Sequence, residues 1–391
     1  MSFTQQDYHH MARAIRLAWR GLYTTDPNPR VGCVIVRDGE IVGEGWHRRA
    51  GEPHAERIAL AAAGERARRA TVYVTLEPCS HHGRTPPCAD ALIEAGVSRV
   101  VAAMEDPNPQ VSGRGLKRLR EAGIEAESGL LEAEAEKLNP GFLKRMRKGL
   151  PWVRCKLAMS LDGRTAMASG ESVWITGEDA RRDVQRLRAR SSAIVTGIGT
   201  VLADDPSLNV RLALEALPGV ESPGYLRQPV RVVLDSSLRT PERAKMLGLP
   251  GETWIFHAHG SEEKAARLEA RGARLTRFEQ GIDLLPVMEE LARRERNEVL
   301  IEAGPTLAGA ALRAGIIDEL VIYMAPHLMG HGARGLFHLP GLERMDQRVP
   351  LEISDIRAVG KDWRITARPA GGRPGQDNHM GRGLELPRSP G

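Results

Sequence analysis

Four side chains with the chemistry of a metal site constrain this 391-residue chain more than any other feature: His54, Glu56, Cys79 and Cys88. His54 and Glu56 stand at the start of a helical pattern, and Cys79 follows a short strand-like run and a proline. One imidazole and two thiolates are common zinc ligands, and a set of three leaves one tetrahedral position open, which is typical of a catalytic site. A fold that uses this set must bring two helix starts and a strand end together.

The spacing of these residues indicates the chemistry. His-x-Glu followed by Pro-Cys matches the signature of zinc-dependent nucleobase deaminases. Zinc lowers the pKa of its water toward about 7, and a carboxylate two residues from the histidine can transfer the proton. The sequence therefore predicts His54, Cys79 and Cys88 as zinc ligands and Glu56 as the catalytic acid and base. The general signature has two residues between its cysteines, whereas residues 80–87 separate them here.

Other interpretations of these residues stay open at this point. His81 and His82 lie inside the longer loop and are competing ligands. Alternatively, Cys79 and Cys88 are buried thiols, but the coincidence with Glu56 is then unexplained. Cys33 lies in an apolar run, and we expect it to be part of the core.

Composition limits the partners and the compartment. Four cysteines are too few for a disulfide scaffold. The polar N-terminus and the lack of an apolar run of about 18 residues predict a cytoplasmic protein without a membrane partner. The nearly neutral charge of the first half and an aromatic content of 4% argue against a nucleic-acid partner. A deaminase of nucleic-acid bases would also leave the second half without a role, and a structural zinc site would need a fourth ligand.

The order of helical and strand-like segments predicts two α/β domains. In the first half we expect helices at 8–20, 54–63 and 88–95 and strands at 31–37, 40–46, 71–76 and 97–104. In the second half we expect strands at 152–159, 192–196, 230–234, 253–257, 299–301 and 320–324 and helices at 178–190 and 284–295. A basic stretch with Gly149 and Pro151 suggests a boundary, which gives domains at 1–149 and 150–369 and a disordered tail at 370–391.

Three loops are candidate ligand sites. Pro27-Asn28-Pro29 is a turn by its chemistry, and its amide could also read the edge of a ring. Residues 300–309 run from a strand through Gly304-Pro305 into a helix, whose free N–H groups would suit a phosphate, although a plain turn would look similar. The G-x-G-x-x-G of residues 330–335 is rejected as a cofactor loop, because residues 336–341 do not form a credible helix.

Together these motifs resemble a known family. Pro27-Asn28-Pro29, His54-Ala55-Glu56, the run from Thr75 to Cys88, Ser160-Leu161-Asp162-Gly163-Arg164 and Glu302-Ala303-Gly304-Pro305 are similar to the bacterial bifunctional deaminase/reductases of riboflavin biosynthesis. The resemblance extends from about Phe3 to Arg368. The eight-residue loop between the cysteines is a feature of this family.

The resemblance implies a cytidine-deaminase-like α/β/α domain followed by a dihydrofolate-reductase-like α/β domain. The first would deaminate 2,5-diamino-6-(5-phosphoribosylamino)pyrimidin-4(3H)-one with zinc, and the second would reduce the ribosyl group of the product to ribityl with NADPH. A homo-oligomer is also expected.

The resemblance assigns site residues by position. NADPH would contact Ala158, Trp174, Thr200, Asp204, Ser236, Gly304, Pro305, Thr306, Leu307, Ala308, Gly309 and Ala310. The substrate would contact Asn28, Ser172, Arg188, Leu208, Arg211 and Glu302. Two arginines, Arg188 and Arg211, can bind a 5′-phosphate through charge-assisted hydrogen bonds.

Several positions have an open role or depart from the family. Lys156 could polarise the sugar or extend to solvent. Arg30 replaces a residue that is often Asn, and we expect it to alter phosphate contacts at the first site. Cys155 and the tail also differ, without consequence for catalysis.

Overall fold

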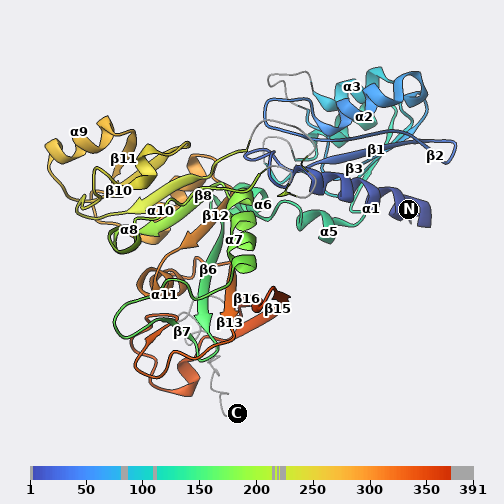
Figure 1. The fold of residues 1–391 in the computed structure, drawn as a ribbon. Helices are drawn as coiled ribbons and strands as arrows, with labels where there is room; N and C mark the ends of the chain where they lie inside the picture. The colour runs from blue at the N-terminus through green and yellow to red at the C-terminus, as the bar shows by residue number, and fades with distance from the viewer. Residues whose placement is uncertain are drawn as a thin grey trace, which may run out of the picture.

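A computed structural model describes residues 3–80, 87–108, 112–213, 216–217, 220 and 226–370, which form two α/β parts (Figure 1). His81 and His82, the competing zinc ligands, lie outside the described residues, as does all but Ala370 of the expected tail. Among the residues that the structure describes, none of the helices combines the length and the hydrophobicity that a bilayer crossing needs.

The N-terminal part is built on a five-stranded sheet in the order β2-β1-β3-β4-β5. Its strands are β1 (Gly32–Arg37), β2 (Glu40–Trp46), β3 (Thr71–Val74), β4 (Arg99–Ala102) and β5 (Glu125–Ser128). Strand β1 is antiparallel to both of its neighbours, β2 and β3, whereas β3, β4 and β5 run parallel to one another.

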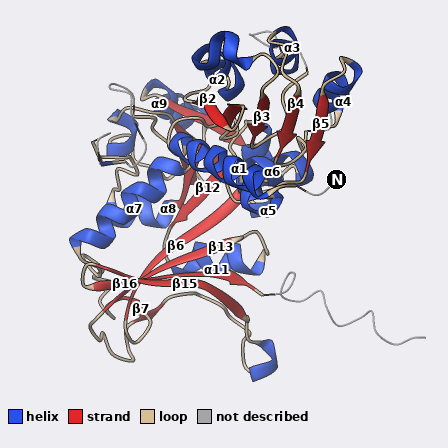
Figure 2. Ribbon diagram, turned by 90° about the vertical axis from the view of Figure 1, so that its right-hand side faces the viewer, coloured by secondary structure: helices blue, strands red, loops and turns tan. Residues whose placement is uncertain are grey.

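Helices cover both faces of this sheet, as Figures 1 and 2 show. Helices α2 (Ala55–Ala63), α3 (Cys88–Glu94) and α4 (Arg114–Glu121) bury their apolar residues in one core. On the opposite face lie α1 (Gln5–Ala18), α5 (Glu132–Glu136) and α6 (Pro140–Lys148). This three-layer arrangement confirms the predicted α/β/α order.

The C-terminal part contains a nine-stranded sheet in the order β11-β10-β9-β8-β12-β6-β13-β16-β15. The strands are β6 (Trp152–Ser160), β8 (Ala193–Gly197), β9 (Val230–Leu234), β10 (Thr253–His257), β11 (Ala273–Arg277), β12 (Glu298–Glu302), β13 (Glu319–Ala325), β15 (Leu351–Val359) and β16 (Asp362–Pro369). The strands from β11 to β13 are parallel, and β16 and β15 are antiparallel. The short strands β7 (Arg164–Ala166) and β14 (Arg334–Gly335) pair separately.

This sheet also has a core on each face. Helices α10 (Leu284–Arg293) and α11 (Pro305–Arg313) contribute to one core. Helices α7 (Glu178–Arg190), α8 (Ile198–Asp204) and α9 (Glu262–Ala270) contribute to the other. The central strands β8, β9, β10 and β12 are therefore buried along nearly their whole length, which explains why they are mostly apolar in the sequence.

Most predicted elements agree with the structure to within a few residues, and the differences have local causes. Helix α1 begins before the predicted residue 8 because Thr4 and Asp7 form a capping box. The basic residues assigned to the domain boundary complete α6, which ends at Gly149 with a φ of +67°. Four strands of the two large sheets are not among the predicted ones. Strands β5 and β11 are mostly polar, the apolar residues of β15 are mostly exposed, and β16 alternates apolar with polar residues.

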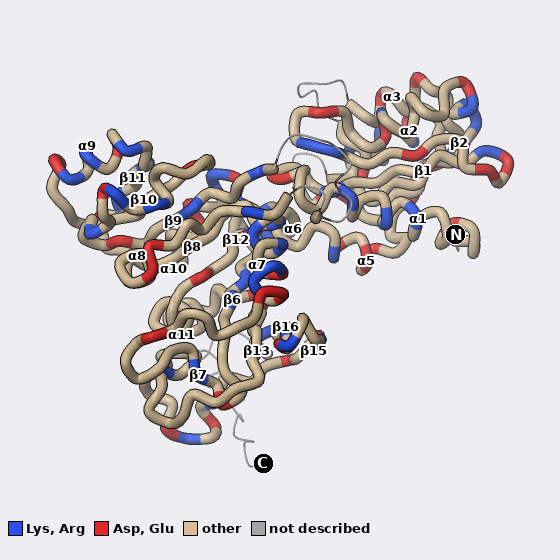
Figure 3. The backbone as a smooth tube through the Cα atoms, in the orientation of Figure 1, with Lys and Arg blue, Asp and Glu red and all other residues tan. Residues whose placement is uncertain are grey.

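The two parts meet through an apolar contact and a buried ionic cluster. Tyr23 of the N-terminal part packs with Ala189 and Val210 of the C-terminal part. Close by, the carboxylate of Glu298, 2% exposed, accepts hydrogen bonds from Arg30 at 2.7 Å and from Arg154. Arg190 lies 3.3 Å from the same carboxylate. Figure 3 shows basic residues around α6, α7 and the start of β12, where the parts meet.

Arg30 therefore does not serve the role that the sequence suggested. Its side chain is 5% exposed and donates to Glu298 and to the carbonyl oxygen of Leu138. A buried guanidinium requires an acidic partner, and the C-terminal part supplies it. The expectation that Arg30 alters phosphate contacts is wrong, because its guanidinium is used at the junction.

We expect Glu298→Gln to lower the free energy of unfolding by about 3 kcal/mol at pH 7, because the buried Arg30 and Arg154 and the half-buried Arg190 lose their shared counter-charge. Burial alone would raise the pKa of Glu298, but Arg30, Arg190 and Arg154 hold it well below its usual value. The stabilisation by Glu298 is therefore fully present above a pH of about 4.3, the pKa of a glutamate carboxyl group in the unfolded chain. It is lost as the pH falls through the lower pKa of Glu298 in the folded protein.

Urea unfolding of both proteins between pH 7 and pH 3 measures this difference. The difference in the free energy of unfolding between the two proteins should stay constant down to about pH 5 and become smaller in stronger acid. Glu178→Gln, on the exposed side of α7, is the control and should cost less than about 1 kcal/mol. A Glu298→Gln protein as stable as the unmodified chain at pH 7 would contradict the assignment of this cluster.

Candidate active sites

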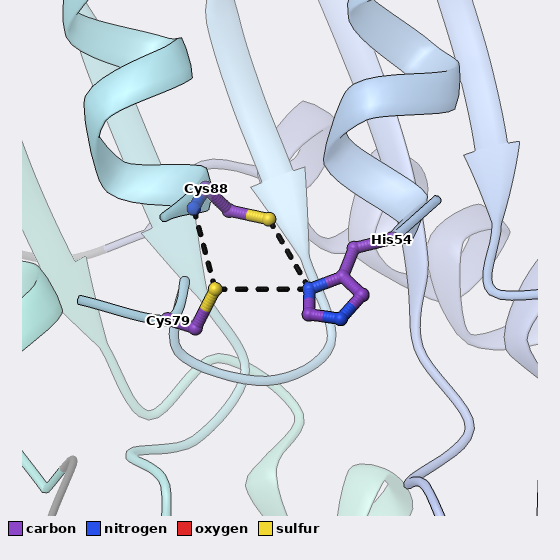
Figure 4. Close-up of side chains that lie close together, drawn as sticks. All are labelled: His54, Cys79 and Cys88. Carbon is purple, nitrogen blue, oxygen red and sulfur yellow. Dashed lines mark hydrogen bonds between the residues drawn. The ribbon is translucent and has the colours of Figure 1, made fainter. Parts of the chain in front are cut away.

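The predicted zinc ligands converge from three elements (Figure 4). His54 is the N-cap residue of α2, and Cys88 is the first residue of α3. Cys79 lies in the loop that follows β3. The structure thus brings together residues that are 34 positions apart in the chain.

Glycines in β2 allow α2 to approach closely enough for this convergence. A Cβ atom on Gly45 would lie 2.5 Å from the carbonyl oxygen of Ala55, and one on Gly43 would lie 2.3 Å from that of Ala59. Both neighbouring atoms belong to the helix backbone, which cannot move aside cheaply. The glycines therefore fix the start of α2, and with it His54 and Glu56, against the sheet.

The geometry of the three side chains fits a tetrahedral zinc ion. The Nδ1 atom of His54 lies 3.7 Å from the Sγ atom of Cys79 and 3.4 Å from that of Cys88. Ordinary zinc–nitrogen and zinc–sulfur bond lengths at a tetrahedral angle give an N···S separation of about 3.6 Å. All three ligand atoms lie within 4.8 Å of one another, and no other group of this kind occurs in the described part of the chain.

The electrostatics of the site also suit a cation. Hydrogen bonding to Cys88 and to His54 lowers the pKa of Cys79, whereas the same hydrogen bond between the two thiols raises the pKa of Cys88, so the metal-free pair favours one thiolate, at Cys79. Glu56 is 3% exposed, and burial raises the pKa of its carboxyl group. Glu56 is not part of the three-ligand group, so its carboxylate remains available beside it.

His47 is a site residue that sequence reasoning missed. It follows β2, and its ring centroid lies 5.3 Å from that of His54. Its Nδ1 atom is 3.1 Å from the carbonyl oxygen of Pro53, and its Nε2 atom is 3.0 Å from Nδ2 of Asn28. Because burial lowers the pKa of His47, the neutral ring donates from Nδ1 and accepts from Asn28. No motif marks His47, and only its place at a strand end could have indicated it.

Glu77 has a structural task that the sequence also did not reveal. Its carboxylate accepts hydrogen bonds from the backbone N–H groups of Asp106, Gly113, Gly115 and Leu116. It therefore holds the start of α4 against the loop that carries Cys79.

In the C-terminal part, most predicted reductase residues follow the carboxyl ends of adjacent parallel strands. Thr200 and Asp204 lie on α8 after β8, Ser236 follows β9, and Glu302 ends β12. Ala158 lies on β6, the next strand in the sheet. Ligands of open α/β sheets bind at this edge, beyond the carboxyl ends of the strands.

The predicted phosphate loop has free backbone donors. Gly304 is the N-cap residue of α11 without a side-chain cap, and Pro305 is at the first helical position. A Cβ atom on Gly304 would meet nothing within 4 Å, so the backbone faces open space. The N-terminus of α11 can therefore accept an anionic group. Residues 336–344 contain no helix, as the sequence predicted for the segment after the 330–335 motif.

The predicted substrate residues of this part form a polar cluster. Arg188 donates to both carboxylate oxygens of Glu302, at 2.6 and 2.8 Å, and to the carbonyl oxygen of Asn209 at 3.1 Å. Arg211 is exposed and contacts the Asn209 side chain at 3.0 Å. Leu208, between them, is buried with a φ of +46°. Arg188 is thus already paired, and Arg211 is the more accessible cation.

Lys156 faces the same cluster. It is opposite Glu302 in the register of β6 and β12. Burial lowers the pKa of Lys156, although the neighbouring Glu302 opposes this change. The structure therefore excludes the interpretation of Lys156 as a side chain that extends freely to solvent.

Ser172 and Trp174 come from a separate segment that follows β7. Trp174 is 72% exposed, and the guanidinium of Arg181 lies 4.7 Å from its ring. The segment is attached to β16 through the Gly177 N–H group, which donates to Asp362 at 2.7 Å. The structure does not bring these two residues into the Arg188 cluster.

Comparisons with known proteins identify both domains. Residues 4–104 match the cytidine and deoxycytidylate deaminase zinc-binding region, and residues 151–365 match the RibD C-terminal domain. The riboflavin biosynthesis protein RibD of Escherichia coli is 57% identical over 360 residues, which cover 91% of this chain and 98% of that protein. RibD of Haemophilus influenzae is 52% identical over 95% of this chain and 100% of that protein.

Solved structures show the same architecture. RibD of Acinetobacter baumannii superposes with a TM-score of 0.86 at 48% identity and covers 94% of this chain and 99% of that one. A Thermotoga maritima protein, described as a diaminohydroxyphosphoribosylaminopyrimidine deaminase/5-amino-6-(5-phosphoribosylamino)uracil reductase, superposes with a TM-score of 0.80 at 32% identity, over 93% of this chain and 99% of that one.

These matches extend over both parts of the chain, and zinc and NADPH are the cofactors of the two domains that they identify. The chain therefore belongs to the RibD family of riboflavin biosynthesis proteins and is a bifunctional enzyme, with a zinc-binding deaminase domain followed by a reductase domain.

Proposed function

We propose that the deaminase domain comprises residues 1–149 and removes the 2-amino group of 2,5-diamino-6-(5-phosphoribosylamino)pyrimidin-4(3H)-one. The reductase domain, residues 150–369, then reduces the ribosyl group of the product to ribityl. The observation that carries the proposal is the fit of His54, Cys79 and Cys88 to a tetrahedral ion beside the buried carboxylate of Glu56. When bound, zinc supplies a water of lowered pKa and NADPH supplies hydride.

In the deaminase domain, His54, Cys79 and Cys88 hold the metal, and Glu56 moves the proton. Because Glu56 is buried next to the ligands and is not one of them, it can take a proton from the attacking water and deliver it to the ring nitrogen. It can then pass the second proton, from the hydroxyl group that was added, to the amine, which leaves as ammonia. The Nδ2 group of Asn28 is directed to His47, which leaves its carbonyl oxygen free to accept from the pyrimidine.

We expect Glu56→Gln to retain stoichiometric zinc and to lower the deaminase kcat at least about 100-fold, because it removes the proton-transfer group and no ligand. Ammonia release and elemental analysis measure the two quantities. Glu52→Gln, an exposed carboxylate two residues before His54, is the matched control. NADPH oxidation with already deaminated substrate should persist in Glu56→Gln, and full ammonia release by this variant would refute the assigned role.

In the reductase domain, we assign NADPH to the strand ends and the α11 N-terminus, with Gly304–Ala310 near its phosphates and Ala158, Thr200, Asp204 and Ser236 along the sheet edge. We assign Ser172 to the substrate and Trp174 to NADPH. Both residues lie on the segment after β7, which would contact the two bound molecules from one side. Although Arg181 lies near the Trp174 ring, the 72% exposure of this residue leaves much of the ring accessible for such a contact.

For the sugar phosphate, Arg211 is the better candidate contact of the two arginines. Its guanidinium is exposed, whereas that of Arg188 is used to orient Glu302. The Glu302 carboxylate, held in this way beside Lys156, can accept a hydrogen bond from a ribose hydroxyl.

We expect Arg211→Gln to raise the reductase KM for its phosphorylated substrate about 10- to 100-fold, since it removes a charge-assisted hydrogen bond. The KM for NADPH and the deaminase activity should not change. Arg274→Gln, an exposed arginine on the edge strand β11, is the control. An unchanged substrate KM in steady-state assays would rule out Arg211 as a phosphate contact.

We also propose a homo-oligomer that forms through β15 and β16. Four apolar side chains on one face of this hairpin are more than 40% exposed, at the open edge of the sheet that Figure 2 shows: Leu351, Ile353, Ile356 and Trp363. An apolar face at a sheet edge is a liability for a monomer, and a second copy offers the same face for a self-complementary contact.

Light scattering measures this association. We expect Ile356→Glu to shift the protein toward monomers, because a charge would be buried in the contact. Glu352→Gln, on the opposite face of β15, is the control and should leave the mass unchanged. A monomeric unmodified protein at micromolar concentration would contradict the proposal.

A further inference from the structure

The loop that carries Asn28 belongs to the deaminase domain, but residues of the reductase domain hold its first half. Asn297, just before β12, donates from Nδ2 to the carbonyl oxygen of Pro27 at 2.7 Å and to Asp26 Oδ1 at 3.2 Å. Ser192, just before β8, donates to the same Asp26 oxygen at 2.8 Å. Arg227 lies 3.5 Å from the other oxygen of Asp26.

The first residue of β12, directly after Asn297, holds the other end of the loop. Glu298 follows Asn297 in the chain and accepts a hydrogen bond from Arg30, two residues after Asn28. Residues 26–30 are thus attached at both ends to consecutive residues, Asn297 and Glu298.

Asn297 is itself fixed in place. It is 4% exposed, and its Oδ1 atom accepts from Arg145 at 2.7 Å. Its backbone oxygen accepts from the Trp152 N–H group at 2.8 Å and would lie 2.3 Å from a Cβ atom on Gly141. Such a residue has no room to follow a moving loop, so the loop must follow it.

Between these attachments, Asn28 has one side-chain contact with the deaminase site, to Nε2 of His47 at 3.0 Å. His47 in turn lies against His54. The path from Asn297 through Pro27 and Asn28 to His47 therefore connects the start of β12 to the zinc site by direct contacts.

We infer that Asn297 of the reductase domain is a positioning residue for the deaminase reaction: by holding Asp26 and Pro27, it places the Asn28 amide against the pyrimidine ring. This inference rests on the proposed role of Asn28. It assigns the reductase domain a part in the first reaction as well as the second, through a residue at the opposite end of β12 from Glu302.

The test compares Asn297→Ala, Asn28→Ala and the double variant in the full chain. We expect Asn297→Ala to raise the deaminase KM about tenfold, because a small displacement of a binding group weakens every contact that it makes in the site. Zinc content and the reductase kcat with deaminated substrate should stay unchanged. Asp26→Ala removes the same attachment from the deaminase side and should act in the same direction, which keeps the test valid if Asn297→Ala does not fold.

Lys144→Met is the matched control. Lys144 pairs with Asp318 at 2.6 Å across the same junction and does not contact residues 26–30. We expect Lys144→Met to leave the deaminase KM unchanged. If it raised this KM as well, loss of any junction contact would weaken the deaminase, and the result would contradict a specific role for Asn297.

The double variant separates positioning from general structural damage. If Asn297 acts through Asn28, Asn297→Ala should add nothing once Asn28 is alanine, whereas independent effects would multiply. Multiplied effects, or an unchanged KM in both Asn297→Ala and Asp26→Ala, would overturn the inference. An unchanged deaminase in Asn28→Ala would instead overturn the proposed function of Asn28.

Discussion

Two buried carboxylates at opposite ends of strand β12 impose the arrangement on which the rest of the structure depends. Neither Glu298 nor Glu302 is more than 9% exposed, and a buried carboxylate needs a cation and hydrogen bonds to remain ionised. Glu298 pairs with Arg30, Arg154 and Arg190, and Glu302 pairs with Arg188. The last turn of α7 supplies one arginine to each end, so this helix cannot slide along the sheet without leaving a buried charge unpaired.

The same requirement connects the two domains. Arg30 comes from the deaminase domain, and the residue that it binds begins the strand that ends in the candidate reductase site. The ionic cluster lies beside the apolar contact of Tyr23 with Ala189 and Val210, which excludes water and strengthens the electrostatic attraction. The two domains are therefore joined by a buried interface in which opposite charges pair, and not only by the polypeptide chain.

Each site is built on an element end that rigid packing holds in place. In the deaminase domain, Gly43 and Gly45 let α2 lie directly on β2, so that His54 and Glu56 face the two cysteines. In the reductase domain, the carboxyl ends of β8, β9 and β12 lie side by side, and the loops after them carry the assigned residues. Both sites thus use groups that the backbone geometry presents at helix starts and strand ends.

The sequence alone determined the α/β/α order and most of the parallel strands, and it predicted the group of His54, Cys79 and Cys88 that the structure brings together, because ligand chemistry and apolar periodicity are local properties of the chain. It also led to the family, since the loop between Cys79 and Cys88 and the Glu302-Ala303-Gly304-Pro305 turn are local motifs. Only the tertiary structure decided the tasks of Arg30, His47 and Asn297. Each depends on a partner far away in the chain, such as Glu298 for Arg30, and no local pattern records which distant charge or amide a side chain will meet when both are buried.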